Sequence, residues 1–142
     1  MVGIVVATHG EIGKALLETA IEIVGFTPIQ VVAVSLEAEI DRAAGWDMIV
    51  QAVDAVDHGD GTLIMVDMFG GTPSNLAISI IAERKVEVLT GVNLAMVLRT
   101  ILKRENQTLP KLASDVLAYG QRNVTSSAQW LNPSPITPMN EL

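Results

Sequence analysis

The chain has 142 residues and a formal net charge of −7 at pH 7, from 9 Lys and Arg against 16 Asp and Glu; this length favours one domain with a sizeable core. The acidic balance argues against nucleic-acid and anionic-membrane partners, which attract basic patches, and leaves room for a basic protein partner. The sequence contains no cysteine, so disulfides, zinc–thiolate sites and thiol nucleophiles are excluded.

The first two predicted elements are a strand and a helix joined by a tight turn. Gly3–Ala7 is a run of small apolar residues that predicts a buried strand. Glu11–Val24 has helical periodicity, and Gly25 is its expected C-cap. One face of this helix is predicted to be apolar: Ile12, Ala15, Leu16, Thr19, Ala20 and Ile23.

Strands and helices then alternate along the chain. In order, the further predicted elements are a strand over Ile29–Leu36, a helix over about Glu39–Val56, a strand over Thr62–Val66, a helix over Pro73–Arg84, a strand over Val86–Thr90, and helices over Leu94–Arg104 and Leu109–Tyr119. Val124–Ser127 is a candidate for a short extra strand. Three prolines in the last residues predict a disordered or loosely docked tail, so we expect a domain over 1–128 and a tail over 129–142.

This alternation of near-continuously apolar strands with helices predicts an α/β fold. The expected architecture is an open, doubly wound sheet of four parallel strands in the order 2-1-3-4, with helices on both faces. In such sheets ligands bind beyond the carboxyl ends of the strands, where the strand order reverses. The first strand leads into His9 and the third into Asp67, so we expect these two side chains to share one crevice.

The ends of the chain and its apolar runs bear on location. The N-terminus has no basic segment before a long apolar run, so no secretory signal is expected. No stretch approaches the roughly 18 apolar residues of a membrane span. Together with the absence of cysteine, these features predict a cytoplasmic protein without direct membrane insertion.

His9 and Asp67 are the main candidates for catalytic chemistry. A carboxylate that accepts a hydrogen bond from one ring nitrogen fixes the tautomer and leaves the other nitrogen as a nucleophile. It also stabilises the cation that forms when that nitrogen is substituted. The plain alternatives are a surface turn histidine for His9 and a capping carboxylate for Asp67.

The segment F-G-G-T-P-S-N, residues 69–75, is a candidate phosphate cradle. Gly70 and Gly71 allow close backbone approach and offer unobstructed N–H groups. Thr72 is a predicted N-cap and Pro73 a first helical residue, which would aim the positive end of a helix at the crevice. The plain alternative is a glycine turn that only reverses the chain. Neither motif contains Lys or Arg, which suits transient carriage of phosphate better than tight nucleotide binding.

Other residues are expected at the margin of this site or outside it. Those expected at its edge are Thr8, Gly10, Ser74 and Asn93. A turn position is the alternative for Asn93. His58 lies in a Gly-Asp-Gly turn and is predicted to be exposed and inert, and two distant histidines without cysteine give no support to a metal site.

Three motifs, A-T-H-G, V-D-M-F-G-G-T-P-S-N and G-V-N-L-A-M-V-L, together resemble the mannose-family IIA domain of the bacterial phosphoenolpyruvate-dependent sugar phosphotransferase system (PTS). The resemblance runs from Val2 to about Val124. It implies an open α/β sheet, a homodimer and a phosphotransferase that carries phosphohistidine from HPr to the IIB component of a sugar permease. No cofactor is implied.

The resemblance also assigns roles to individual residues. The phosphorylated histidine falls on His9, the orienting aspartate on Asp67, and the family's G-G-S-P turn on residues 70–73. Two positions depart from the family pattern: Met68 replaces a residue that is often polar, and Phe69 replaces the usual tryptophan. Either departure affects partner fit rather than phosphate chemistry. IIB is expected to be a separate protein.

Several other functions need sequence features that this chain lacks. A phospho-aspartate receiver would need an acidic pair after the first strand, a hydrolase would need G-x-S-x-G after a strand, and a flavin module would need more aromatic residues. Phosphate supply to a dihydroxyacetone kinase is disfavoured by the Gly-Gly-Thr-Pro turn. A regulatory phosphorelay protein that uses His9 without feeding a permease stays open.

Overall fold

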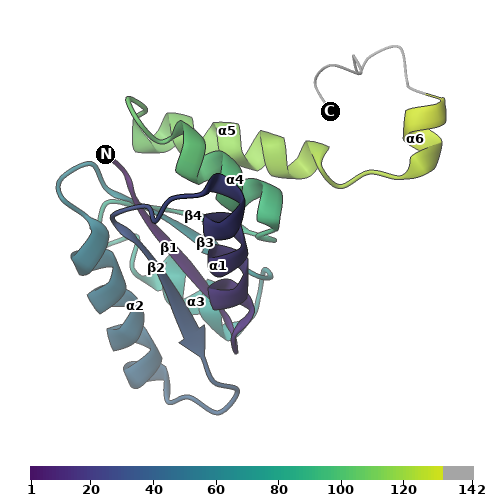
Figure 1. Cartoon of the computed structure of the whole chain (residues 1–142). Coiled ribbons are helices and arrows are strands. Elements are labelled where there is room, and N and C mark those ends of the chain that lie inside the picture. The colour runs from purple at the N-terminus through teal and green to yellow at the C-terminus, as the bar shows by residue number, and fades with distance from the viewer. Residues whose placement is uncertain (133–142) are drawn as a thin grey trace.

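The computed structural model describes residues 1–132, so most of the expected tail, residues 133–142, lies outside the described residues (Figure 1). All strand pairings are parallel and the strand order is β2-β1-β3-β4, which confirms the predicted architecture. The four strands are β1 (Gly3–His9), β2 (Val31–Leu36), β3 (Thr62–Val66) and β4 (Val86–Thr90).

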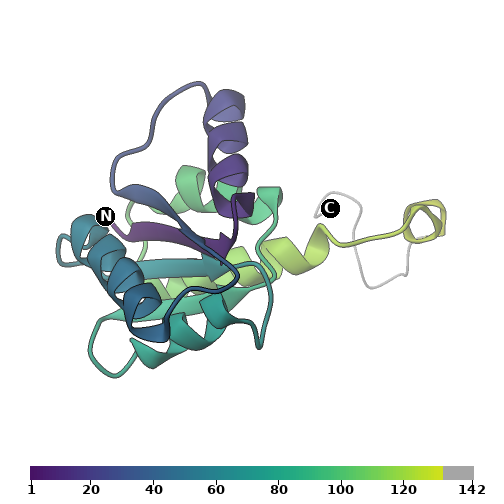
Figure 2. The same ribbon diagram turned by 90° about the horizontal axis from the view of Figure 1, so that it is seen from below.

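Helices cover both faces of the sheet, as Figure 2 shows. The helices are α1 (Ile12–Val24), α2 (Arg42–Val56), α3 (Thr72–Ser79), α4 (Leu94–Lys103), α5 (Leu109–Arg122) and α6 (Ser127–Leu131). One buried cluster joins the sheet to α1, α4 and α5, and a second joins it to α2 and α3. No helix among residues 1–132 combines the length and apolar character needed to cross a membrane.

β1 is one of the two inner strands of the sheet, and it faces both clusters. Ile4 and Val6 belong to the cluster under α1, whereas Val5 and Ala7 belong to the cluster under α2, and all four are fully buried. This alternation is the period-two geometry of a strand. Full burial of each Val or Ile side chain is worth roughly 1.5–3 kcal/mol, so β1 is a rigid support for the residue at its end, His9.

The predicted apolar face of α1 is correct at Ala20, which is fully buried, and wrong at both ends, where Ile12 and Ile23 are 52% and 58% exposed. The other buried residue of this helix is Gly13, which was not predicted. The cause is a close approach at the start of the helix: a Cβ on Gly13 would lie 3.0 Å from the Val6 carbonyl oxygen. A side chain at Gly13 would crowd the Val6 carbonyl and the Thr8 side chain, so this glycine lets the start of α1 lie close to β1.

The structure differs from two further predictions, the end of the third helix and the short strand expected after the fifth helix. α3 ends at Ser79 rather than Arg84, because the N–H groups of Ile80 and Ile81 bond to carbonyls three residues back in tighter turns. The short strand predicted over Val124–Ser127 does not form, and Ser127 instead begins α6. Ser126 and Gln129 form a reciprocal capping box there, which satisfies N–H groups at a helix start.

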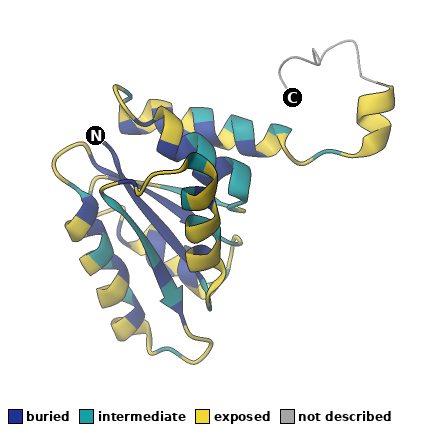
Figure 3. Ribbon diagram, viewed as in Figure 1, coloured by how far each residue is buried: buried dark blue, intermediate teal, exposed yellow. Residues whose placement is uncertain are grey.

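α6 stands apart from the rest of the described chain (Figure 3). Every residue of α6 is exposed, including Trp130 at 57% and Leu131 at 79%. Val124, in the segment that leads to it, is 76% exposed. The boundary expected at residue 128 falls within this helix.

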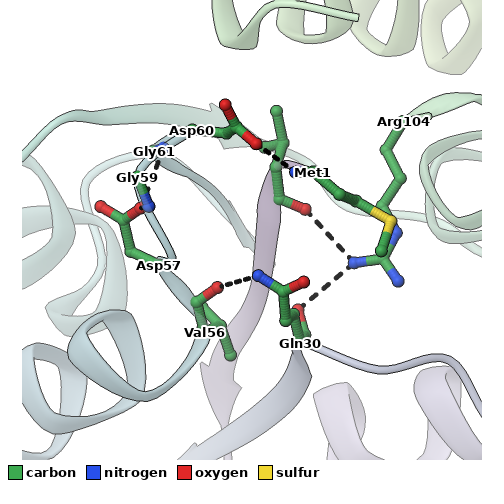
Figure 4. Close-up of polar contacts among 9 residues, drawn as sticks. Met1, Gln30, Val56, Asp57, Gly59, Asp60, Gly61 and Arg104 are labelled. Carbon is green, nitrogen blue, oxygen red and sulfur yellow. Dashed lines mark hydrogen bonds and ion pairs between the residues drawn. The ribbon is translucent and has the colours of Figure 1, made fainter. Parts of the chain in front are cut away.

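The edge of the sheet where the strands begin is held by Arg104 (Figure 4). Its guanidinium is buried and donates to the carbonyls of Val2 at 3.2 Å and Ile29 at 2.6 Å. It also donates to the carbonyl of Gln30, whose amide donates to Val56. Burial lowers the pKa of Arg104 from its usual value. These bonds join the end of α4 to the start of β1, opposite the edge where His9 lies.

Candidate functional site

The carboxyl ends of β1 and β3 meet at one edge of the sheet, as the strand order predicted. His9 is the last residue of β1, and Asp67 directly follows β3. The two strands are hydrogen-bonded neighbours with Ala7 opposite Val66. This register puts His9 and Asp67 side by side.

Asp67 accepts two hydrogen bonds from His9 through one oxygen. Its Oδ2 lies 2.7 Å from His9 Nδ1 and 3.1 Å from the His9 backbone nitrogen. An ionised carboxylate only accepts, so this contact assigns the ring proton to Nδ1. Nε2 then carries the lone pair, and no other described residue forms a hydrogen bond with it.

The contact with His9 also affects the ionisation of Asp67. Partial burial opposes ionisation of this carboxyl, but the hydrogen bonds from the His9 ring and backbone, together with attraction to His9, outweigh it and lower its pKa. The His9 side chain is 42% exposed and that of Asp67 only 14%. The acceptor is therefore held in place while the imidazole stays accessible.

Gly71 packs against the imidazole. A Cβ at this position would lie 2.7 Å from His9 Cε1 and 3.2 Å from Nε2, and 3.5 Å from Met68 Cγ. A side chain would therefore displace the ring. The sequence predicted this glycine as an N–H donor and did not predict its contact with the ring.

The glycine turn delivers the start of α3 to this edge. Gly70 has φ +84°, a left-handed conformation that favours glycine. The N-cap of α3 is Gly71, so the prediction of Thr72 as N-cap is wrong; Thr72 and Pro73 are the first two helical residues. The chain reaches the helical conformation one residue earlier than expected because Gly71 itself adopts the extended geometry of a cap. No described side chain caps this helix.

The residues expected at the edge of the site have distinct positions. Thr8 is fully buried, and its Oγ1 accepts a hydrogen bond from Gly13 N at 2.7 Å. Gly10 has φ +50° and donates to the Leu36 carbonyl at 3.0 Å. Thr8 thus ties α1 to β1 on the face opposite Gly71, a role that a threonine just before a helix start could have indicated.

Ser74 and Asn93 lie further along the chain. The Ser74 hydroxyl is fully buried on the first turn of α3 and has no hydrogen-bond partner among residues 1–132. Asn93 is the N-cap of α4, where its Oδ1 accepts from Met96 N at 3.0 Å. The structure gives neither residue a hydrogen bond to His9, so their place at the edge of the site stays a prediction.

The second histidine and a metal site are the remaining points that the sequence raised. His58 is exposed, as predicted. Within the described part of the chain, no group of three or more His, Asp or Glu side chains could hold a metal ion. The candidate site therefore consists of an accessible imidazole, a carboxylate that is hydrogen-bonded to it and a helix start without a side-chain cap.

This chain is similar in sequence to known proteins of one family. A family model described as "PTS system fructose IIA component" matches residues 3–117. The chain is 30% identical over 132 residues to the fructose-specific EIIA component of the PTS of Bacillus subtilis, covering 92% of this chain and 90% of that protein. It is also 30% identical over 116 residues to the mannose-specific EIIAB component of Escherichia coli, covering 74% of this chain and 32% of that protein.

A solved structure supports the same relationship. It is the PTS IIA protein associated with the fucose utilization operon of Streptococcus pneumoniae, with a TM-score of 0.80 and 25% sequence identity. The match covers 92% of this chain and 96% of that one.

Proposed function

Because the chain belongs to the PTS EIIA family of mannose type, we propose that it is a phosphohistidine carrier that accepts a phosphoryl group on His9. Family membership supports a phosphoryl-carrier role in sugar transport. The observation that carries the assignment to His9 is the 2.7 Å contact between its Nδ1 and Asp67, which leaves Nε2 as an exposed nucleophile.

The proposed reaction is an in-line transfer between two histidines. Nε2 of His9 attacks the phosphorus of the donor's phosphohistidine, the N–P bond of the donor breaks, and its electrons return to the donor imidazole. No water, metal or nucleotide is consumed. The His9 ring keeps its Nδ1 proton, and the cation formed on substitution is stabilised by Asp67. Such a loose transition state depends mainly on positioning and on dipoles.

The start of α3 is proposed to hold the transferred oxygens. Gly71 lies against the imidazole, so the N–H groups that follow it are close to a phosphoryl group on Nε2. We assign this role to the turn of Gly70, Gly71 and Thr72, with the Thr72 hydroxyl as a further donor. A helix N-terminus favours negative charge, and the absence of a side-chain cap on α3 leaves its N–H groups available.

The proposed partners follow from the family. HPr is the donor, and a separate IIB protein of a mannose-family sugar permease is the acceptor. The same geometry runs in both directions, because each step exchanges one phosphorylated histidine for a nucleophile of similar strength. This reversibility is what a carrier requires.

We also propose a homodimer, supported by two unpartnered apolar surfaces on this chain. The first is the α6 segment with exposed Val124, Trp130 and Leu131. The second is a depression of about 460 Å³ beside the edge strand β4, lined by residues that include Phe69, Ile78, Ile81, Val88 and Leu117. Seating the segment of one copy in the depression of another would bury both surfaces.

The carrier role is tested by labelling. Incubation with phosphoenolpyruvate, enzyme I and HPr is expected to place an acid-labile, alkali-stable phosphate on this protein. His9→Ala is expected to abolish the label, while His58→Ala, the control at the exposed second histidine, keeps it. Full labelling of His9→Ala would overturn the assignment.

A further inference from the structure

Charge is distributed unevenly along the described chain. Residues 1–93 carry four Lys and Arg against 13 Asp and Glu, whereas residues 94–132 carry five Lys and Arg against two acidic residues. The second range contains α4 and α5, which pack against each other (Figure 1). These two helices are therefore the positively charged part of an otherwise acidic molecule.

Three of these cations gather where α4 and α5 meet. Arg99 and Lys103 lie one turn apart on α4, and Arg99 donates to both oxygens of Asp115 on α5 at 2.8 Å. Tyr119 and Arg122 follow Asp115 at helical spacing, on the same side of α5. All five residues are partly or fully exposed. We call Arg99, Lys103, Asp115, Tyr119 and Arg122 the cationic patch.

Tyr119 holds two guanidinium groups close together. Cζ of Arg99 lies 4.8 Å from the centroid of the Tyr119 ring, and Cζ of Arg122 lies 5.9 Å from it. Both distances are within the range of a cation–π interaction, but the two positive charges repel each other. Arg122 has no ion pair within residues 1–132, and its buried Nε has no hydrogen-bond partner there. The packing thus fixes a cation that the described chain leaves without a counter-charge of its own.

One carboxylate serves all three cations of the patch. The hydrogen bonds from Arg99 lower the pKa of Asp115 most, and attraction to Arg99, Arg122 and Lys103 lowers it further, although partial burial opposes them. Arg122 and Lys103 therefore lie near enough to act on a carboxylate that is already bonded to Arg99. Three positive charges against one negative charge leave the patch with a net +2 in a chain of net −7. An anion from outside would compensate this excess.

The spacing of the cations fits an acidic protein segment. Arg99 and Lys103 are four residues apart, which is about 6 Å along a helix, and Arg122 comes from the neighbouring helix. Charges spread in this way match several carboxylates of a protein better than one compact anion. Tyr119 adds an aromatic surface of the kind that is enriched in protein interfaces. The acidic range 1–93 would repel the same segment, so charge directs it to this surface.

We propose that the cationic patch is a docking surface for an acidic segment of a partner protein. The patch is formed by α4 and α5, whereas His9 bonds to Asp67 and packs against Gly71, which belong to other parts of the chain. The patch also shares no residue with the depression beside β4. Leu117, which lines that depression, is two positions from Asp115 and so lies about 200° around the helix from it. The proposal does not depend on the carrier function, and it leaves His9 accessible while the partner is bound.

The test compares neutralised cations inside and outside the patch. Lys103→Gln/Arg122→Gln removes two cations of the patch. Lys14→Gln/Arg42→Gln makes the same change in net charge at exposed positions on α1 and α2. Each protein is titrated with a dye-labelled peptide of alternating Glu and Ala at several salt concentrations. Fluorescence anisotropy gives the Kd, and the amide NMR signals show where on the protein the peptide binds.

Lys103→Gln/Arg122→Gln is expected to raise the Kd for this peptide by about three- to tenfold at low salt, and added salt should reduce the difference. Lys14→Gln/Arg42→Gln should match the wild type, and the amide signals that shift should belong to α4 and α5. Equal Kd values for the patch variant and the wild type, or shifts that fall mainly on other elements, would overturn the proposal.

A second variant is expected to change the affinity in the opposite direction. Asp115→Asn removes the negative charge that competes with the peptide for Arg99, so the Kd should fall, whereas Asp47→Asn, at an exposed position on α2, should leave it unchanged. A Kd that did not fall in Asp115→Asn would contradict the proposal. Phosphorylated HPr should label Lys103→Gln/Arg122→Gln as fast as the wild type; slower labelling would assign the patch to the phosphoryl donor and overturn a separate docking surface.

Discussion

Asp67 and His9 are joined twice, because one carboxylate oxygen receives both the ring N–H and the backbone N–H of the same histidine. The backbone hydrogen bond fixes the position of the His9 main chain, and the ring hydrogen bond fixes the orientation of its imidazole. A single carboxylate thus determines position and tautomer together.

Asp67→Asn tests this double contact. The amide keeps the size of the side chain but loses its charge, and a hydrogen bond to a charged group is worth about 1.5–3 kcal/mol. We therefore expect labelling of His9 to slow by about 10- to 150-fold, with the fold intact by circular dichroism. Asp54→Asn, which removes a carboxylate that pairs with Arg84, is the control, and an unchanged rate in Asp67→Asn would remove the orienting role.

Gly71→Ala tests the contact with the imidazole. The added methyl would come within 2.7 Å of His9 Cε1, so the ring must shift, and a displacement of about 1 Å at a reacting group can cost about 100-fold in rate. The shift should also appear in the NMR signals of the His9 ring. Gly25→Ala, where a Cβ meets nothing within 4 Å, strains the backbone far from the ring and should leave those signals in place.

Thr8 is predicted to position the histidine turn through its hydroxyl. Thr8→Val keeps the shape of the side chain but leaves the Gly13 N–H without its acceptor. An unsatisfied buried group costs about 1–3 kcal/mol, which should appear as a lower free energy of unfolding in urea. Thr8→Ser restores the acceptor, so it should recover most of the loss; equal losses in both variants would assign the effect to packing.

The pair Arg99–Asp115 gives a stability that depends on pH. Both oxygens of Asp115 accept from Arg99 at 2.8 Å, and these bonds lower the pKa of Asp115 below 3.8 although partial burial opposes them. Because the pKa of Asp115 is lower in the folded protein than in the unfolded chain, the ionised carboxylate stabilises the fold at pH values above 3.8. This contribution is lost as the pH falls through the pKa of the folded state. Asp115→Asn should therefore lower the free energy of unfolding by about 1 kcal/mol near neutral pH, and the difference should shrink in strong acid.

Urea titrations of the two proteins across this pH range make the comparison. Asp47→Asn, at an exposed position on α2, controls for the loss of one negative charge. A constant difference between wild type and Asp115→Asn down to strong acid would contradict the linkage.

Trp130 and Leu131 are predicted to hold the homodimer together. Trp130→Ser/Leu131→Ser removes the largest exposed side chains of α6, so the mass measured by light scattering should fall from dimer to monomer at micromolar concentration. Leu102→Ser, which removes another apolar side chain that is 58% exposed, should leave the dimer intact. Wild-type protein that is monomeric throughout would contradict the proposed dimer.

The sequence predicted the bounds of the short, mainly apolar strands best. The bounds of Thr62–Val66 and Val86–Thr90 match the structure, because short apolar runs between turn signals leave little freedom. The meeting of His9 with Asp67 followed from strand order alone. By contrast, the sequence did not predict contacts between elements. The close approach of Gly13 to β1 and that of Gly71 to the imidazole depend on the packing of distant segments, which a single glycine or a Gly-Gly pair does not indicate.

The inner position of β1 means that its neighbours on both sides come later in the chain. The ribosome releases the histidine early, but its carboxylate lies 58 positions later, and the arginine that secures Val2 lies 102 positions later. Closing such long loops costs chain entropy before any contact repays it. In a nascent chain, His9 therefore lacks its hydrogen-bonded carboxylate until Asp67 has emerged. We expect its imidazole to become oriented only when β2 and β3 have paired with the two sides of β1.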